Sequence, residues 1–173
     1  MLDTRDQILE AARELIVERG YDATSFAAIA ERLGVTKAGV AYHFHPKQTL
    51  LLALLRPVAT EVHALLAAPA DRTVEGRRAF AVAYLDTLLA HREIVGLLVN
   101  DRAVQSDHEI GERAGHLRDQ ALDRIATGGS PSELTLAWAT LGAIHIGIWR
   151  TLDQPVEDVR PVLHAAVGAL VGA

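Results

Sequence analysis

Apolar residues recur along this chain at intervals of three and four positions, which is the pattern of amphipathic helices. The first such stripe consists of Ile8, Ala11, Ala12, Leu15 and Ile16. Thr4 and Gln7 have the T-x-x-Q spacing of a capping box, which satisfies free backbone groups at the start of a helix. Gly20 stands where a glycine ends many helices. The pattern therefore predicts a helix between Thr4 and Gly20.

Three further helices are predicted immediately downstream. Ser25 is a suitable N-cap for the second helix, and the third is expected over residues 36–44. Pro46 can open the fourth, because proline fits the first turn of a helix, and the apolar run Leu50–Leu55 continues it. Pro57 removes a backbone donor, so we expect it to kink or divide this fourth helix.

The rest of the chain continues in helical periodicity. Helices are predicted over residues 57–68, 75–91, 93–104, 106–126, 131–150 and 158–171. Gly128 and Gly129 break the pattern before Ser130-Pro131-Ser132-Glu133, which has the spacing of a second capping box. We find no alternating strand pattern and no internal repeat. The sequence therefore predicts an all-α fold.

Residues 134–149 contain no charged side chain. This run is shorter than the roughly 20 residues that cross a membrane, so we expect it inside the protein rather than in a bilayer. A helix that is apolar on every side should be buried on every side. Ala139, Ala143 and Gly147 form a stripe of small residues along which another helix can approach closely.

Residues 24–50 have the spacing of a helix-turn-helix. Ala30 is small where the two helices cross, Gly34 supplies a left-handed turn residue, and Val40 fills the seam between the helices. A polar cluster without an obvious core role follows, made of Tyr42, His43 and Lys47. In a helix-turn-helix the second helix enters the major groove while neighbouring groups contact phosphates. The sequence therefore predicts a protein that binds double-stranded DNA.

Residues 4–55 resemble the DNA-binding domain of the tetracycline-repressor (TetR) family. The resemblance is carried by Ser25–Ala30, Gly34–Lys37 and Tyr42–Phe44. It implies a dimeric, all-helical bacterial repressor whose C-terminal domain binds a small molecule and then releases its operator DNA. The two domains expected are a three-helix helix-turn-helix DNA-binding domain over residues 1–50 and a helical effector-binding and dimerisation domain over residues 51–173.

The resemblance also assigns residues to DNA contacts. The expected set is Ser25, Thr36, Lys37, Ala38, Gly39, Tyr42, His43 and Lys47. Two departures from the family pattern limit base readout: Ala41 replaces a frequent second tyrosine, and Ala27 and Ala28 replace residues that are often polar. Direct readout should then rest chiefly on Lys37, whose favoured partner is guanine, with DNA shape supplying the remainder.

The C-terminal half is expected to hold a dimer interface and a ligand pocket. The interface residues expected are Ala139, Ala143, Gly147 and Val167. The pocket should lie among the helices over 57–68, 75–91, 93–104, 108–126 and 131–150, lined mainly by apolar groups. Its expected polar and aromatic residues are Tyr84, Trp138, His145 and Trp149, which are amphipathic groups on otherwise apolar faces.

Composition and charge add three points. The chain has no cysteine, which excludes disulfides and thiolate chemistry. The net charge is −5, yet residues 24–56 carry four basic groups against one acidic group, a local balance of +3. Screening makes local charge matter more than total charge for phosphate attraction. The N-terminal residues include acidic groups and no apolar signal region, so a cytoplasmic location is expected.

Other functions remain open at this stage. A DNA-binding dimer without a small-molecule effector is the main alternative, because the C-terminal half is short for a roomy pocket. A metal-binding helical enzyme is a distant third, since the eight histidines lack the close ligand spacing of zinc sites. No G-x-S-x-G, phosphate-binding glycine loop or H-E-x-x-H occurs, so no enzymatic activity, metal or cofactor is expected. The ligand, the operator sequence, the regulated genes and the direction of regulation are undetermined.

Overall fold

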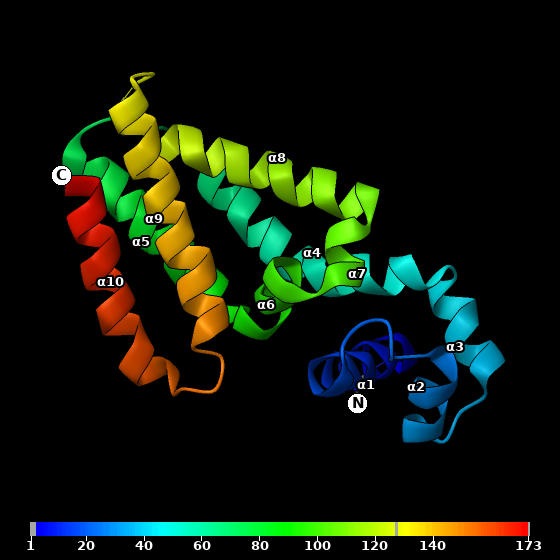
Figure 1. The fold of residues 1–173 in the computed structure, drawn as a ribbon. Helices are drawn as coiled ribbons and strands as arrows, with labels where there is room; N and C mark the ends of the chain where they lie inside the picture. Colours follow the sequence, from blue (N-terminus) through cyan, green and yellow to red (C-terminus); the bar gives the residue numbers. More distant parts are fainter. Residues whose placement is uncertain (1–2, 127, 173) are drawn as a thin grey trace.

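The computed structural model describes residues 3–126 and 128–172, which are all-helical and contain no strand. The helices are α1 (Thr4–Arg19), α2 (Phe26–Leu33), α3 (Lys37–Phe44), α4 (Lys47–Ala67), α5 (Val74–Ala90), α6 (Arg92–Asn100), α7 (Arg102–Ser106), α8 (His108–Ile125), α9 (Pro131–Arg150) and α10 (Val156–Gly172). The α1–α3 unit and the α9–α10 pair lie at opposite ends of the molecule (Figure 1).

Helices α1–α3 and the start of α4 enclose their own apolar core. The stripe expected on α1 packs there, and the buried residues of the other three helices are Ile29, Ala30, Val40, Phe44 and Leu50. The start of α1 differs from expectation. Asp3, not a Thr4–Gln7 capping box, is the N-cap, and its carboxylate accepts from the Arg5 backbone N–H. A carboxylate is also favoured at the positive end of the helix dipole.

The turn between α2 and α3 forms as predicted. Ser25 caps α2 through its Oγ, which accepts from the Ala28 N–H at 3.2 Å. Gly34 ends α2 in the left-handed region with φ 68°, a conformation that costs other residues energy. Thr36 then caps α3, its Oγ1 accepting from the Gly39 N–H at 3.0 Å. These caps fix where the two helices of the helix-turn-helix begin.

Two predicted helix boundaries are wrong. Helix α4 runs without interruption from Lys47 through Pro57 to Ala67, so Pro57 does not divide it. The helix predicted over 93–104 is instead two helices that meet at Asp101. The Asp101 carboxylate caps α7 by accepting from the N–H groups of Ala103 and Val104. An aspartate that can bond backbone N–H groups favours such a break.

The larger core joins α5, α8, α9 and α10 with the second half of α4. The capping box at Ser130 and Glu133 is present as predicted, and Pro131 begins α9. Helix α9 is not buried on every side, however. One of its faces is exposed, with Leu134, Trp138 and Ile146 between 38% and 48% accessible. The α9–α10 pair therefore presents apolar surface to solvent.

Candidate DNA-binding surface and effector cavity

Helix α3 presents a short polar and aromatic surface. Its buried side chains Val40 and Phe44 attach it to α1 and α2. On the opposite side Lys37 is exposed, and Tyr42 is 85% accessible although it is a large aromatic residue. Both side chains are therefore accessible to a partner.

The other residues expected at the DNA surface lie around this helix. Thr36 and Ala38 are exposed at its N-terminus, Gly39 is half-buried beneath the Thr36 hydroxyl, and Ser25 is exposed at the start of α2. His43 is half-buried, and its ring contacts the Tyr42 ring edge-to-face with centroids 5.3 Å apart. The N-termini of α2 and α3 also direct free backbone N–H groups outward, which suits phosphate.

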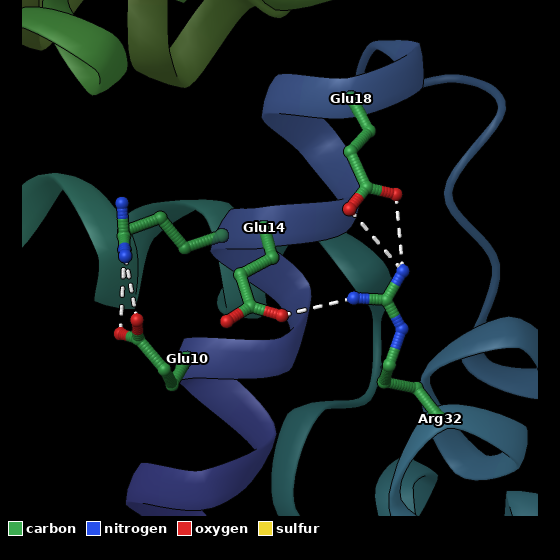
Figure 2. Close-up of polar contacts among 5 residues, drawn as sticks. Glu10, Glu14, Glu18 and Arg32 are labelled. Carbon is green, nitrogen blue, oxygen red and sulfur yellow. Dashed lines mark hydrogen bonds and ion pairs between the residues drawn. The ribbon is translucent and has the colours of Figure 1, made fainter.

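The local positive charge is engaged within the protein more than the sequence indicates. Figure 2 shows Arg32 of α2 between Glu14 and Glu18 of α1, with nitrogen–oxygen distances of 2.9 and 3.0 Å. Arg32 thus ties α2 to α1. Exposed ion pairs contribute little stability individually. These pairs nevertheless engage Arg32, which is one of the four basic groups that give residues 24–56 their positive balance.

Lys47 is also held by the fold. Its ammonium donates to the Tyr21 carbonyl oxygen and lies 4.1 Å from the centroid of the Tyr21 ring. Burial lowers the pKa of Lys47, while the carboxylates of Asp22 and Asp101 oppose that shift. In this arrangement Lys47 anchors the α1–α2 connection, so its expected reach to phosphate requires leaving these contacts. Lys37 has no such partner among the described side chains.

A cavity of about 830 Å³ lies between the DNA-binding helices and the C-terminal core. Helices α4 and α8 supply most of its walls, and α1, α5, α6, α7 and α9 supply the rest. By length and composition α4 could span a membrane, but it packs against α1, α3, α5 and α8, and its remaining apolar residues face this cavity. The position agrees with the helices expected to surround a pocket.

Two of the four expected pocket residues line the cavity. Tyr84 and His145 do, whereas Trp138 and Trp149 do not. The Arg118 guanidinium lies 5.4 Å from the Trp138 ring and itself lines the cavity, so it stands between that indole and the hollow. Trp149 is half-buried under Arg150. Trp138 and Trp149 share α9 with His145, but the cavity reaches α9 at His145 and does not extend to either tryptophan.

Tyr84 and His145 form the polar floor of the cavity. The Tyr84 hydroxyl and His145 Nε2 are 3.1 Å apart, and their rings meet edge-to-face. Burial lowers the pKa of His145 to about 4, with the Arg118 charge adding to the effect, so the imidazole is neutral at pH 7. Burial also raises the pKa of Tyr84 to about 12. The floor therefore offers neutral hydrogen-bonding groups.

Three polar contacts that the sequence did not reveal join the two halves of the chain. The Tyr21 N–H donates to Asp101 Oδ2 at 2.9 Å. Gln48 Nε2 donates to both carboxylate oxygens of Asp107, at 2.8 and 2.9 Å. Arg13 of α1 pairs with Glu93 of α6. Asp101 and Asp107 in these contacts are also the N-caps of α7 and α8. A shift of either helix would therefore displace groups that are bonded to the DNA-binding helices.

The expected dimer residues divide between surface and core. Ala139 is exposed and Ala143 is half-buried. Val167 is fully buried in the core, and a Cβ on Gly147 would come within 2.7 Å of Leu163 on α10. Val167 therefore serves packing within the chain, which corrects its expected place in the interface, whereas Gly147 is half-buried and its place in an interface stays a prediction. At 3.6 residues per turn, positions eight apart are rotated by about 80°, so the small-residue stripe turns from solvent toward α10.

An additional exposed apolar surface comes from α10. Val162 is 67% accessible, and Ala165, Ala166 and Ala169 are exposed on the same helix. Together with Leu134, Trp138 and Ile146 of α9, these residues form what we call the α9–α10 face. An apolar face of this kind marks an interaction surface in a monomer.

Within residues 3–126 and 128–172 no group of three or more potential metal ligands comes together. The histidine considered for such a site, His108, contacts the single carboxylate of Glu112 at 3.4 Å and is solvent-exposed.

Comparison with known proteins finds sequence similarity over the DNA-binding helices. Residues 8–54 match the model for bacterial regulatory proteins, tetR family. The HTH-type transcriptional regulator TtgR of Pseudomonas putida is 45% identical over 53 residues, which are 31% of this chain and 25% of TtgR. The matched region thus spans a quarter of the length of the first curated relatives, namely their DNA-binding part.

Solved structures extend the likeness to the whole fold. Mycobacterium smegmatis AmtR superposes with a TM-score of 0.76 at 24% identity, over 99% of this chain and 87% of AmtR. AibR, solved in complex with isovaleryl coenzyme A and operator DNA, gives a TM-score of 0.70 at 23% identity, over 95% of this chain and 97% of AibR. At these identities the likeness concerns the fold.

Proposed function

We propose that this chain, whose N-terminal domain belongs to the tetR family of bacterial regulatory proteins, is a dimeric transcriptional regulator whose DNA affinity is set by a small ligand. The observation that carries the proposal is the geometry of α3. A left-handed Gly34 turn and the Thr36 cap hold this helix against α2, with Lys37 and Tyr42 directed to solvent. A helix presented in this way fits the major groove.

The DNA contacts are assigned by position. Lys37 and Ala38 at the N-terminus of α3 face base edges, with Thr36 and Gly39 beside them. The residues on the backbone side, toward phosphate, are Ser25, Tyr42, His43 and Lys47. Because Arg32 and Lys47 are engaged within the fold, each subunit offers little free charge, and firm binding requires two subunits.

The α9–α10 face supplies the dimer. A two-fold axis brings identical surfaces together, so one exposed apolar face suffices for a closed assembly. Ala139 and Ala143 allow close approach of the partner's α9, while Trp138, Ile146 and Val162 supply apolar area. In one chain α3 lies away from the α9–α10 pair (Figure 1), so a dimer joined through this face would leave both α3 helices free to read two half-sites.

The cavity supplies the ligand site. Its volume lies within the 300–1,000 Å³ typical of small-molecule sites, and its walls are mainly apolar with a few polar groups, Tyr84 and His145 among them. This size favours a ligand-controlled regulator over a DNA-binding dimer that answers to no small molecule. A ligand between α4 and α8 would press on the helix that follows α3, and so favour release of the operator. The protein would act in the bacterial cytoplasm, where the DNA lies.

Selection from random double-stranded DNA tests the proposal. The protein should enrich a two-fold symmetric sequence, and fluorescence anisotropy should then show much tighter binding to that sequence than to a scrambled duplex. Tyr42→Ala should weaken binding strongly, whereas Tyr21→Phe, which removes a hydroxyl away from α3, should not. Failure to enrich any sequence would contradict DNA recognition.

A further inference from the structure

The charged side chains that line the cavity are of one sign. Among its described lining residues are Arg5, Arg56, Arg113 and Arg118, and there is no aspartate or glutamate. This bias is notable in a chain with 22 acidic and 17 basic side chains and a net charge of −5. A hollow with low-dielectric walls concentrates the field of such charges.

Two of these arginines have no carboxylate partner in the described structure. Arg113 pairs with Glu109 at 2.6 Å and Arg118 with Asp119 at 3.1 Å, and neither acidic residue lines the cavity. Arg5 and Arg56 form no ion pair with another described side chain; Arg5 instead lies 4.9 Å from the centroid of the Phe44 ring. The positive charge of this pair is uncompensated, and both side chains border the hollow.

The two arginines without a carboxylate partner and the Tyr84–His145 pair lie on different helices around the cavity. Beside the larger effect of burial, the charge of Arg118 on α8 is close enough to act to lower the pKa of both Tyr84 and His145. Arg5, with Thr49, Ala53 and Arg56 of α4, lies on the side of the DNA-binding helices. The Tyr84–His145 floor lies on α5 and α9 of the C-terminal core and carries no charge at pH 7. The wall between these two regions is apolar, formed by Leu52, Leu55, Leu88, Leu98 and Leu117 among others.

Helix α8 makes room for a bulky occupant. Gly111, Ala114 and Gly115 face the cavity, although glycine inside a helix costs about 1 kcal/mol relative to alanine. A Cβ on Gly111 would meet nothing closer than the Gln105 carbonyl oxygen at 3.9 Å, and one on Gly115 nothing closer than Arg118 at 3.6 Å. Packing within the chain therefore does not require glycine at either position. Their effect is to leave space beside α4.

From this arrangement we infer that the ligand is an anionic amphiphile, an organic acid or phosphate ester with an apolar body. Its head group is bound by Arg56 and Arg5, and its body lies along α4 and α8 toward Tyr84 and His145. The inference rests on the proposed function in taking the cavity as the effector site. Guanidinium groups bind carboxylate and phosphate in paired hydrogen bonds, which suits this assignment.

The position of the head group also suggests how the signal reaches DNA. Arg5 belongs to α1 and contacts Phe44, the last residue of α3. An anion that draws this guanidinium toward the cavity weakens a cation–π contact between α1 and α3. The ligand then acts on the recognition helix through one side chain.

Four probes with alkyl chains of nine or ten carbons and different head groups test the inference. Decanoate, decyl phosphate, decanol and decyltrimethylammonium are added below micelle-forming concentrations, and thermal unfolding and calorimetric titration report binding to the full chain. We expect the anions to raise the Tm and bind at least tenfold more tightly than decanol, and the cation to bind least. The two anions compared with each other distinguish a carboxylate from a phosphate head group.

Two variants locate the head group and the body. Arg56→Gln should weaken anion binding about tenfold and leave decanol binding unchanged. Arg102→Gln, which removes the same charge from an exposed residue outside the lining, is the matched control and should change neither. Gly115→Leu should block all probes while keeping or raising the Tm of the free protein, because leucine favours the helix.

Several results would overturn the inference. Equal binding of decanol and decanoate would remove the role of charge, as would an equal effect of Arg56→Gln and Arg102→Gln. No binding of either anion would reject this ligand class. The DNA selection described above does not use these probes, so failure of this inference is distinguishable from failure of the proposed regulator.

Discussion

Lys37 and Lys47 are the chain's two lysines, and the structure gives them opposite surroundings. Lys37 is exposed at the first position of α3. Lys47 is half-buried, donates to the Tyr21 carbonyl and lies over the Tyr21 ring. From the sequence both were expected to contact DNA. The structure separates them, because only Lys37 can meet a base or phosphate without giving up an interaction within the protein.

Exchanging each lysine for alanine tests this separation. Lys37→Ala should leave the Tm unchanged and cost about 1–3 kcal/mol of affinity per lost guanine contact on the selected DNA, relaxing preference at one base position. Lys47→Ala should lower stability by roughly 1 kcal/mol, because a cation–π contact and a hydrogen bond are lost. Thermal unfolding and anisotropy titrations measure both effects. A larger Tm loss for Lys37→Ala would contradict the assignment.

His145 gives the cavity floor a predictable pH dependence. Its pKa is about 4 in the folded protein, below the value near 6.5 of an unfolded chain, so the unfolded state binds the proton first. Its contribution to stability is fully present above pH 6.5 and is lost as pH falls toward 4. The loss approaches about 1.4 kcal/mol per pH unit within that window. Tyr84 does not titrate there, since its pKa is about 12.

Urea unfolding of His145→Phe between pH 7 and pH 4 measures this contribution. As pH falls, the free energy of unfolding of the variant should decrease less steeply than that of the unchanged protein. The two slopes should differ by up to about 1.4 kcal/mol per pH unit. His108→Phe is the matched control, because that histidine is exposed on α8. Parallel curves for the unchanged protein and His145→Phe would show that the imidazole is not held neutral.

At the scale of helices, the caps and boundaries that depend on neighbours in the sequence could be predicted. Those that depend on tertiary contacts could not. Ser25 and the Ser130–Glu133 box bond neighbours three residues away, so their patterns are visible in the sequence. The break at Asp101 depends partly on the Tyr21 N–H, which is 80 positions distant in the chain. Asp3 was missed for a different reason, since Thr4 and Gln7 offered an equally good local pattern.

The candidate sites follow the same division. The exposure of α3 could be predicted because the helix-turn-helix spacing fixes which face is buried. Tyr84 and His145 were expected from their polarity on apolar faces, but the same criterion wrongly included Trp138 and Trp149 in the cavity. Arg56 and Gly115 were not identified, because arginines and glycines on a helix look like solvated or tolerated positions until α4 and α8 are brought together.

The contact between Gln48 and Asp107 allows a test of how α4 is joined to α8. Gln48→Ala removes only this bond, whereas Asp107→Ala also removes the N-cap of α8, in which the carboxylate accepts from the Ile110 N–H. We expect Asp107→Ala to destabilise the protein by about 1 kcal/mol more than Gln48→Ala. The double variant should match Asp107→Ala alone, because one partner is already gone.

Urea unfolding of the three variants supplies the free energies. Gln154→Ala is a suitable control for loss of an exposed glutamine side chain, since its backbone carbonyl rather than its side chain accepts from Arg92. Full additivity of the two single changes would mean that Gln48 and Asp107 do not interact in solution.

Over the whole molecule, the exposed surface of α3 and the α9–α10 face lie at different ends (Figure 1). The DNA-binding helices carry the exposed Lys37 and Tyr42, while the α9–α10 face carries Trp138, Ile146 and Val162. The cavity lies between them and is connected to the DNA-binding helices by the contacts at Asp101 and Asp107. Residues 3–50 carry seven acidic and six basic side chains, so attraction to the duplex would come from the local charge beside α3 rather than from the charge of the whole domain.

The dimer is the assembly on which operator binding depends, and a single charge can test it. Ile146 and Val162 are 48% and 67% accessible in one chain but would be buried between two. Ile146→Glu or Val162→Glu would place two unpaired carboxylates in a two-fold interface, at a cost of about 3 kcal/mol or more, which is over a hundredfold in the dimer dissociation constant. Each variant should therefore be monomeric by light scattering at concentrations where the unchanged protein is dimeric.

The same variants should bind the selected DNA weakly, because a monomer engages one half-site and two basic side chains near α3, Arg32 and Lys47, are engaged within the fold. Val17→Glu is the matched control: Val17 is 46% accessible and lies on α1, at the other end of the molecule from the α9–α10 face, so its variant should remain dimeric. Circular dichroism should show all three folded, which separates loss of assembly from loss of structure. A dimeric Ile146→Glu protein with full affinity for a two-fold site would mean that the partner binds elsewhere, and that the α9–α10 face serves another contact.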